Sequence, residues 1–167
     1  MPYIPHLKNC PLFKGLSEEE IAVYRPASRL VSYKQGESIM VEGATGETLE
    51  ILIKGQVTIS KKLTLLGEDE QDSKDKTFIT LTEEFKPFFG EMAMLMDDSL
   101  RTASVIASSD CEMVIMEKSP FQDACAKHPA IGLQVMENIA RKLATNLERE
   151  SKNVLKLTTA FSLVLEE

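Results

Sequence analysis

The stretch Phe89–Leu95, with the sequence FGEMAML, is followed after a short acidic segment by RTASV at Arg101–Val105. Gly90 ends an apolar run and lets the backbone approach a ligand closely, and a short helical turn after it would present amide N–H groups. Arg101 carries a permanent positive charge, and its planar guanidinium can bind a phosphate through two parallel hydrogen bonds. Glu91 can accept a hydrogen bond from a sugar hydroxyl. The segment therefore predicts a site for a phosphate joined to a sugar.

This segment resembles the phosphate-binding cassette of the cyclic-nucleotide-binding domain family, which includes the bacterial catabolite activator proteins and the regulatory subunits of cyclic-AMP-dependent kinase. The ten positions from Glu91 to Arg101 match the spacing of the catabolite activator branch. In a 3′,5′-cyclic nucleotide the 2′-hydroxyl is the only free ribose hydroxyl, and the resemblance implies that Glu91 binds it. It also implies phosphate contacts from one guanidinium, one hydroxyl and three backbone amides: Arg101, Thr102, Gly90, Met92 and Ala93.

Other roles remain open for these side chains. Glu91 could cap the turn that follows Gly90, and Thr102 could satisfy a carbonyl group at the end of a strand. Short motifs often match a family by chance. In that case Glu91 and Arg101 could simply form an ion pair on the surface beside a turn.

Two residues farther along the chain are further candidates for the ligand site. In the family a long helix closes over the purine, and an ungapped comparison places the base-contacting positions at Asn146 and Leu147. Asn146 offers a donor and an acceptor to a base edge, whereas Leu147 offers neither. Lys142 could reach the base or the phosphate, or it could be a solvated lysine. The resemblance implies cyclic AMP or cyclic GMP as the ligand, with cyclic AMP favoured and the base preference left open.

Short apolar runs separated by glycine occupy most of the chain around the cassette. Seven runs have the composition of strands: Leu30–Tyr33, Ser38–Val41, Glu50–Ile53, Gln56–Ser60, Thr77–Leu81, Thr102–Ala107 and Cys111–Met116. Strands of this length with a turn signal between them predict an antiparallel barrel or jelly roll. The first runs, with Gly36, Gly43, Gly46 and Gly55 between them, also resemble the first half of the same family. We therefore expect a mainly β fold with flanking helices: an antiparallel β-roll (double-stranded β-helix) with a long C-terminal helix.

Two short helices are predicted outside the strands. Ser17 and Glu20 have the spacing of a capping box, and the helix that they begin should end before Pro26. Ser119 is expected to cap a second helix, with Pro120 at its first position.

A long helix is predicted from about Pro129 to the end of the sequence. Nine of its residues form a stripe with a period of 3.5: Met136, Ala140, Leu143, Leu147, Glu150, Val154, Leu157, Phe161 and Val164. The first turns can pack on the roll, but the apolar residues after Leu147 need another partner, so we expect a homodimer through this helix. On this basis residues 1–128 form the cyclic-nucleotide-binding roll with its short helices. Residues 129–167 form a dimerisation and lid helix of the same domain.

The overall composition is typical of a globular domain, with 167 residues, 43% hydrophobic and 27% charged. The net charge of −7 lacks the basic excess of nucleic-acid-binding proteins. The 21 residues after Asn146 continue a helical pattern, so we expect no helix-turn-helix and no DNA partner. The sequence shows no apolar run long enough for a membrane span and no signal-peptide pattern, and its three cysteines are widely spaced. We therefore expect no membrane partner and a cytoplasmic location.

Residues typical of catalysis or metal binding are sparse. The histidines His6 and His128 lie far apart, and the adjacent Asp97 and Asp98 are more typical of a solvated turn than of a metal site. We expect no catalytic residue, no metal and no cofactor, and we expect the charged segment 67–76 to be a solvated loop.

These observations lead to two hypotheses. The first is a stand-alone, non-enzymatic sensor of cyclic nucleotides, which signals to an unidentified protein effector through ligand-dependent movement of its C-terminal helix. The second is a degenerate form of the same fold, which acts as a dimeric interaction module without a ligand.

Overall fold

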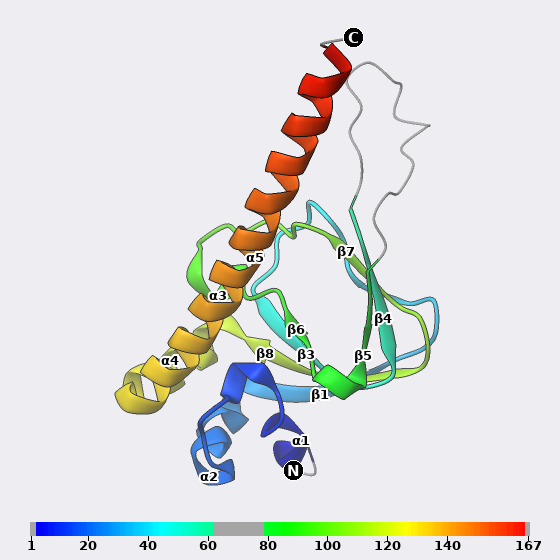
Figure 1. Ribbon diagram of the computed structural model, residues 1–167. Helices are drawn as coiled ribbons and strands as arrows, with labels where there is room; N and C mark the ends of the chain where they lie inside the picture. The colour runs from blue at the N-terminus through cyan, green and yellow to red at the C-terminus, as the bar shows by residue number, and fades with distance from the viewer. Residues whose placement is uncertain (1–2, 62–78, 166–167) are drawn as a thin grey trace.

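Two four-stranded antiparallel sheets face each other and form a roll (Figure 1). The computed structural model describes residues 3–61 and 79–165, and only the backbone of residues 164 and 165. In spatial order the first sheet contains β1 (Ser28–Tyr33), β8 (Cys111–Glu117), β3 (Thr48–Lys54) and β6 (Phe88–Phe89). The second sheet contains β2 (Ser38–Met40), β7 (Ser104–Ala107), β4 (Gln56–Ser60) and β5 (Ile79–Thr82). The predicted β-roll is confirmed, and the charged segment 67–76 lies outside the described residues.

Residues of strand β3 alternate between the two faces of the first sheet. Leu49, Ile51 and Ile53 are buried against the helices outside the roll. Leu52 is fully buried between the two sheets, and the same alternation points Glu50 inward, where only 4% of the residue is exposed. The strand therefore carries one carboxylate into the interior of the roll.

Short helices cover the outer face of the first sheet. They are α1 (Ile4–Leu7), η1 (Pro11–Phe13), α2 (Glu18–Ile21), η2 (Ala22–Ala27) and α4 (Lys118–Lys127), where η marks a 3₁₀ helix. The ring of Tyr24 in η2 stacks on Phe121 of α4 with 5.2 Å between the ring centroids, and it lies 5.5 Å from the ring of Phe13 in η1. This aromatic cluster joins the N-terminal helices to α4.

The predicted capping box at the start of α2 is confirmed. The Ser17 backbone N–H donates to Glu20 Oε2 at 2.7 Å, and the Glu20 backbone N–H donates to Ser17 Oγ at 3.3 Å. The prediction that this helix ends before Pro26 is also confirmed, because α2 ends at Ile21; the separate 3₁₀ helix η2 then runs through Pro26 to Ala27. A proline at the end of a helical segment removes only one donor, and its fixed φ suits the turn.

The predicted second helix is present as α4, but its predicted start, with Ser119 as the N-cap residue and Pro120 at the first position, is wrong. The helix begins at Lys118, with Glu117 as the N-cap residue, so Ser119 lies inside its first turn. Strand β8 extends to Glu117 and runs directly into the helix, which leaves Ser119 no capping position.

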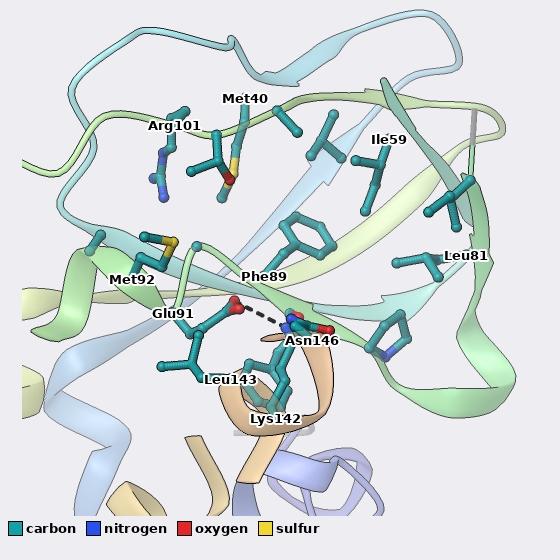
Figure 2. Close-up of a pocket in the computed structure, with 18 of the residues that line it drawn as sticks. Met40, Ile59, Leu81, Phe89, Glu91, Met92, Arg101, Lys142, Leu143 and Asn146 are labelled. Carbon is teal, nitrogen blue, oxygen red and sulfur yellow. Dashed lines mark hydrogen bonds and ion pairs between the residues drawn. The ribbon is translucent and has the colours of Figure 1, made fainter. Parts of the chain in front are cut away.

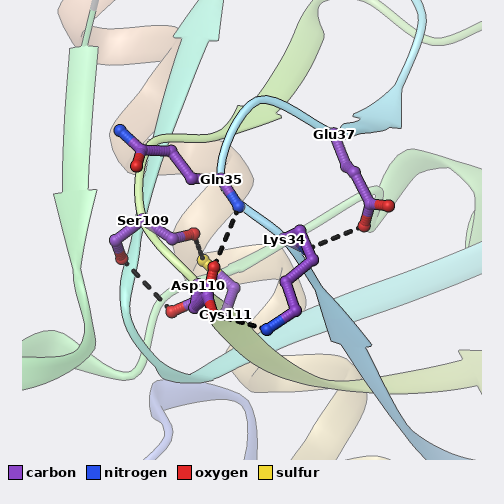
Figure 3. Close-up of polar contacts among 6 residues, drawn as sticks. All are labelled: Lys34, Gln35, Glu37, Ser109, Asp110 and Cys111. Carbon is purple, nitrogen blue, oxygen red and sulfur yellow. Dashed lines mark hydrogen bonds and ion pairs between the residues drawn. The ribbon is translucent and has the colours of Figure 1, made fainter.

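Two turns that connect the sheets are held together at one end of the roll (Figure 3). Asp110, in the turn between β7 and β8, accepts hydrogen bonds from Lys34 Nζ at 2.7 Å and from the Gln35 backbone N–H at 3.1 Å. Glu37 accepts a hydrogen bond from the Lys34 backbone N–H at 2.7 Å. The β1–β2 turn is thereby fixed against the β7–β8 turn.

The long helix α5 (Pro129–Leu165) starts against the roll and then projects away from it (Figure 1). Val135 and Ile139 are fully buried, and Asn138 Nδ2 donates to the backbone oxygens of Leu12 at 3.0 Å and Lys14 at 2.9 Å. The later apolar residues of the predicted stripe are mostly exposed: Leu147 (69%), Val154 (61%), Leu157 (71%) and Phe161 (67%). The first part of α5 thus belongs to the core, whereas the second part offers an uncovered apolar stripe.

Within residues 3–61 and 79–165, no helix has the length and apolarity needed to span a membrane.

Candidate ligand-binding site

A cavity of about 860 Å³ lies between the cassette, the strands behind it and helix α5 (Figure 2). It is lined by all eight residues that the sequence proposes for the ligand: Gly90, Glu91, Met92, Ala93, Arg101, Thr102, Lys142 and Asn146. Figure 2 shows Arg101 and Met40 across the cavity from Leu143 and Asn146 of α5. The fold therefore brings the cassette and the C-terminal helix to one site. The contacts of these residues with a ligand stay predictions.

Gly90 forms the turn between β6 and the short helix α3 (Met92–Leu95). Its φ of +80° favours glycine, and a Cβ atom there would lie 2.5 Å from Arg101 Nη1 and 2.6 Å from the Thr48 backbone oxygen. The Ala93 N–H donates to the Gly90 backbone oxygen at 3.1 Å, so a phosphate that binds this amide must share or replace that bond.

The Arg101 guanidinium lies at the edge of the cavity and has a protein partner. Its Nη1 donates to the Thr48 backbone oxygen at 2.8 Å, and its Nη2 donates to Thr48 Oγ1 at 2.7 Å. Gly46 leaves space for this arrangement, because a Cβ atom there would clash with the guanidinium. Burial lowers the pKa of Arg101, and the negative charge of Glu50 opposes that shift. The guanidinium has five donors, so N–H groups remain for an anion.

Glu91 and Lys142 join the cassette to α5. Lys142 Nζ donates to Glu91 Oε2 at 3.0 Å and to the Phe88 backbone oxygen, and it lies 3.9 Å from the centroid of the Phe88 ring. Burial lowers the pKa of Lys142, and the charge of Glu91 opposes that shift. Lys142 is therefore not the solvated lysine of the alternative interpretation. The surface ion pair between Glu91 and Arg101 is also wrong, because Glu91 is only 8% exposed and pairs with Lys142.

The remaining predicted residues lie at the rim of the cavity. Thr102 is exposed, and Asn146 is half-buried. Asn146 Oδ1 accepts a hydrogen bond from Arg149 Nη2 at 3.4 Å, so the amide is already oriented by its own helix.

Apolar side chains form the wall of the cavity between these polar groups. Four of them are labelled in Figure 2: Met40, Ile59, Leu81 and Phe89. A guanidinium, a carboxylate and an apolar wall can together bind a phosphate, a hydroxyl and a flat ring, and the volume is within the range of small-molecule sites. In the described part of the chain, no group of three His, Cys, Asp or Glu side chains is placed to hold a metal ion.

Sequence reasoning missed the groups that hold Arg101. Thr48 and Gly46 lie more than fifty positions before the arginine, so no local spacing connects them. Glu50 had a usable signal, because a single charge in the apolar run Leu49–Ile53 marks a carboxylate on a buried strand.

Comparison with known proteins matches this chain to a cyclic nucleotide-binding family model and to proteins named for cyclic GMP or cyclic AMP. The family model described as the cyclic nucleotide-binding domain matches residues 30–128. A cGMP-dependent protein kinase of Drosophila melanogaster (isozyme 2 forms cD5/T2) is 35% identical over 107 residues, which cover 64% of this chain and 10% of the kinase. The cyclic AMP receptor protein of Thermus thermophilus is 28% identical over 137 residues, which cover 82% of this chain and 59% of the receptor. The chain thus spans less than two thirds of the length of these curated relatives.

A solved structure of the catabolite activator protein from Thermus thermophilus has a TM-score of 0.72 against this chain at 30% identity. The superposition covers 89% of this chain and 63% of that one, so it includes the roll together with much of α5. The family match alone contains the whole cassette from Gly90 to Arg101. The chain therefore belongs to the cyclic nucleotide-binding domain family.

Proposed function

We propose that this chain is a non-enzymatic sensor domain that binds a cyclic nucleotide in the cytoplasm and passes the signal through α5 to a protein effector. One observation carries the proposal: Glu91, a predicted ligand residue of the cassette, is bound to Lys142 of α5 inside the cavity that also contains Arg101. The phosphate would bind Arg101, and the ribose 2′-hydroxyl would bind Glu91. Further phosphate contacts would come from one hydroxyl and three backbone amides: Thr102, Gly90, Met92 and Ala93.

The Glu91–Lys142 pair offers a route from ligand to helix. A ribose hydroxyl that donates to Glu91 competes with Lys142 for the same carboxylate. A ligand that alters this contact stabilises one position of α5 over another, and the difference in affinity between the two positions drives the change.

We expect cyclic AMP to bind more tightly than cyclic GMP. The spacing from Glu91 to Arg101 and the likeness to the cyclic AMP receptor protein of Thermus thermophilus support this preference. Asn146 at the rim would meet the base edge, where its amide can both donate and accept.

A thermal unfolding experiment tests the proposed function. Ligand at a hundred times its dissociation constant should raise the free energy of unfolding by about 2.7 kcal/mol, and at equal ligand concentrations the midpoint should shift more with cyclic AMP than with cyclic GMP. Linear AMP, which lacks the ring of the phosphodiester, serves as the control. An unchanged midpoint with both cyclic nucleotides at millimolar concentration would favour the second candidate, an interaction module without a ligand. The observation behind that candidate is that Glu91 and Arg101 both have protein partners.

A ligand without the 2′-hydroxyl should bind the parent protein about tenfold to a hundredfold more weakly, because a hydrogen bond to a buried carboxylate is lost. Glu91→Gln should shrink this difference between the ribo and deoxy ligands, since the amide is a weaker acceptor. Glu137→Gln, a change on the outer side of α5, should leave it intact. Titration calorimetry with the six protein–ligand pairs gives the answer, and equal affinities of the parent for both ligands would exclude Glu91 from ribose binding.

A further inference from the structure

Glu50 is a buried carboxylate without full hydrogen bonding. It is 4% exposed, and its Oε2 atom is the buried side-chain oxygen that lacks a hydrogen-bond partner among the described residues. Its Oε1 accepts a hydrogen bond from Thr48 Oγ1 at 3.4 Å. Buried polar groups are nearly always paired in folded proteins, so this carboxylate requires a physical explanation.

Thr48 connects Glu50 to the arginine of the cassette. The Thr48 hydroxyl accepts a hydrogen bond from Arg101 Nη2 at 2.7 Å and donates to Glu50, so the three side chains form a chain from the cavity into the roll. Arg101 lines the cavity, whereas Glu50 is not among the described residues that do. An effect of Glu50 on a ligand would therefore act through Arg101.

The pKa of Glu50 depends on its burial and on the charged groups around it. Arg101 lies on the cavity side, and Arg29 and Tyr33 come from β1, which is separated from β3 by β8. Glu117 at the end of β8 is ion-paired with Arg29 at 3.7 Å. Burial raises the pKa of Glu50 to about 7, against the opposing effects of Arg101, the Thr48 hydrogen bond and Arg29. Near neutral pH the carboxylate is thus close to half-protonated, and Arg101 is the principal charge that stabilises its ionised form.

We propose that Glu50 is a positioning residue for Arg101 and that it takes up a proton when the phosphate of a cyclic nucleotide binds. This inference rests on the proposed function. In the free protein the ionised carboxylate attracts the guanidinium toward Thr48 and into the roll. A bound phosphate neutralises Arg101 and adds a second negative charge nearby, so the ionised form of Glu50 loses its stabilising partner. A proton from solvent then converts the buried carboxylate to its neutral acid.

Proton uptake fixes the direction of the pH dependence. The complex holds more protons than the free protein, so a lower pH favours binding and a higher pH opposes it. The affinity should be nearly constant below pH of about 6 and should fall above pH of about 7, by at most about tenfold per pH unit for one proton.

Titration calorimetry with cyclic AMP tests the inference. The parent should bind about fivefold to tenfold more weakly at about pH 8.5 than at about pH 6, a range in which the cyclic phosphodiester keeps its single charge. Glu50→Gln, which is nearly isosteric and cannot ionise, should bind equally at both pH values, and more tightly than the parent at the higher one. Glu84→Gln removes an exposed carboxylate and should behave like the parent.

A second measurement uses the parent alone, in case Glu50→Gln does not fold. At about pH 7.5 the binding enthalpy should differ between HEPES and Tris buffers, because the two buffers release a proton with different enthalpies and the complex takes up part of a proton. Binding without proton uptake, or a pH dependence that persists in folded Glu50→Gln, would overturn the inference and leave the proposed function intact. No binding by the parent at either pH would refute both.

Discussion

Replacement of Arg101 by alanine should weaken cyclic nucleotide binding by about a hundredfold or more while the protein stays folded. Two parallel hydrogen bonds from a guanidinium to a phosphate contribute several kcal/mol in a partly buried site, where the dielectric constant is lower than in water. The substitution also removes both hydrogen bonds to Thr48, which should lower the free energy of unfolding by about 1–3 kcal/mol. Titration calorimetry with cyclic AMP gives the affinity, and thermal unfolding followed by circular dichroism gives the stability.

Two further variants separate the geometry of Arg101 from its charge. Arg101→Lys keeps the charge but cannot form two parallel bonds, so its affinity should fall between those of the parent and the alanine variant. Arg141→Ala removes a cation whose side chain is 78% exposed on α5, and it should bind like the parent. If Arg101→Ala binds within a few-fold of the parent, the cassette does not bind phosphate and the proposed function is wrong.

The double variant Leu157→Glu, Phe161→Glu should convert a dimer of this chain into a folded monomer. Both side chains are about two-thirds exposed on the stripe of α5, and burial of a Leu- or Phe-sized side chain contributes roughly 1.5–3 kcal/mol. Several such residues from each copy can exceed the cost of association. Glu150 also lies on this stripe, but Arg149 Nε is 4.0 Å from its carboxylate and reduces the repulsion between two copies.

Sedimentation equilibrium at about 50 μM measures the oligomeric state, since an interface of this size should be occupied at that concentration. The control is Thr159→Glu, Ser162→Glu, which adds the same charge to a different face of the same exposed segment and should remain dimeric. A monomeric parent at this concentration would exclude the dimer, and then the exposed Val154, Leu157 and Phe161 would need a different partner.

The strands and the cassette could be predicted because their signals are local. Alternating apolar residues and positive-φ glycines determine backbone conformation within a few residues, and Gly90 has the φ of +80° that its position after β6 suggests. The spacing from Glu91 to Arg101 likewise lies within one loop. These features depend little on how distant parts of the chain meet.

The contacts inside the site could not be predicted because they depend on tertiary register. Thr48 reaches Arg101 across 53 positions, and Glu91 reaches Lys142 across 51. A shift of one residue in the pairing of β3 would turn Glu50 out of the roll, and a rotation of α5 by one residue would move Lys142 by about 100° around the helix axis. Only the assembled fold determines which cation meets which carboxylate.

The attachment of α5 at Lys142 also has a mechanical consequence. The 23 residues after Lys142, up to Leu165, rise by about 1.5 Å each, so the helix extends about 35 Å beyond its contact with Glu91. A continuous helix of this length is a stiff rod, and a tilt of about 10° at Lys142 would carry its tip through about 6 Å, slightly more than one helical turn. In the proposed function the helix would therefore act as a lever, with a short arm packed against the roll and a long arm outside it, and small angular changes at Lys142 would become displacements large enough for another protein surface to detect.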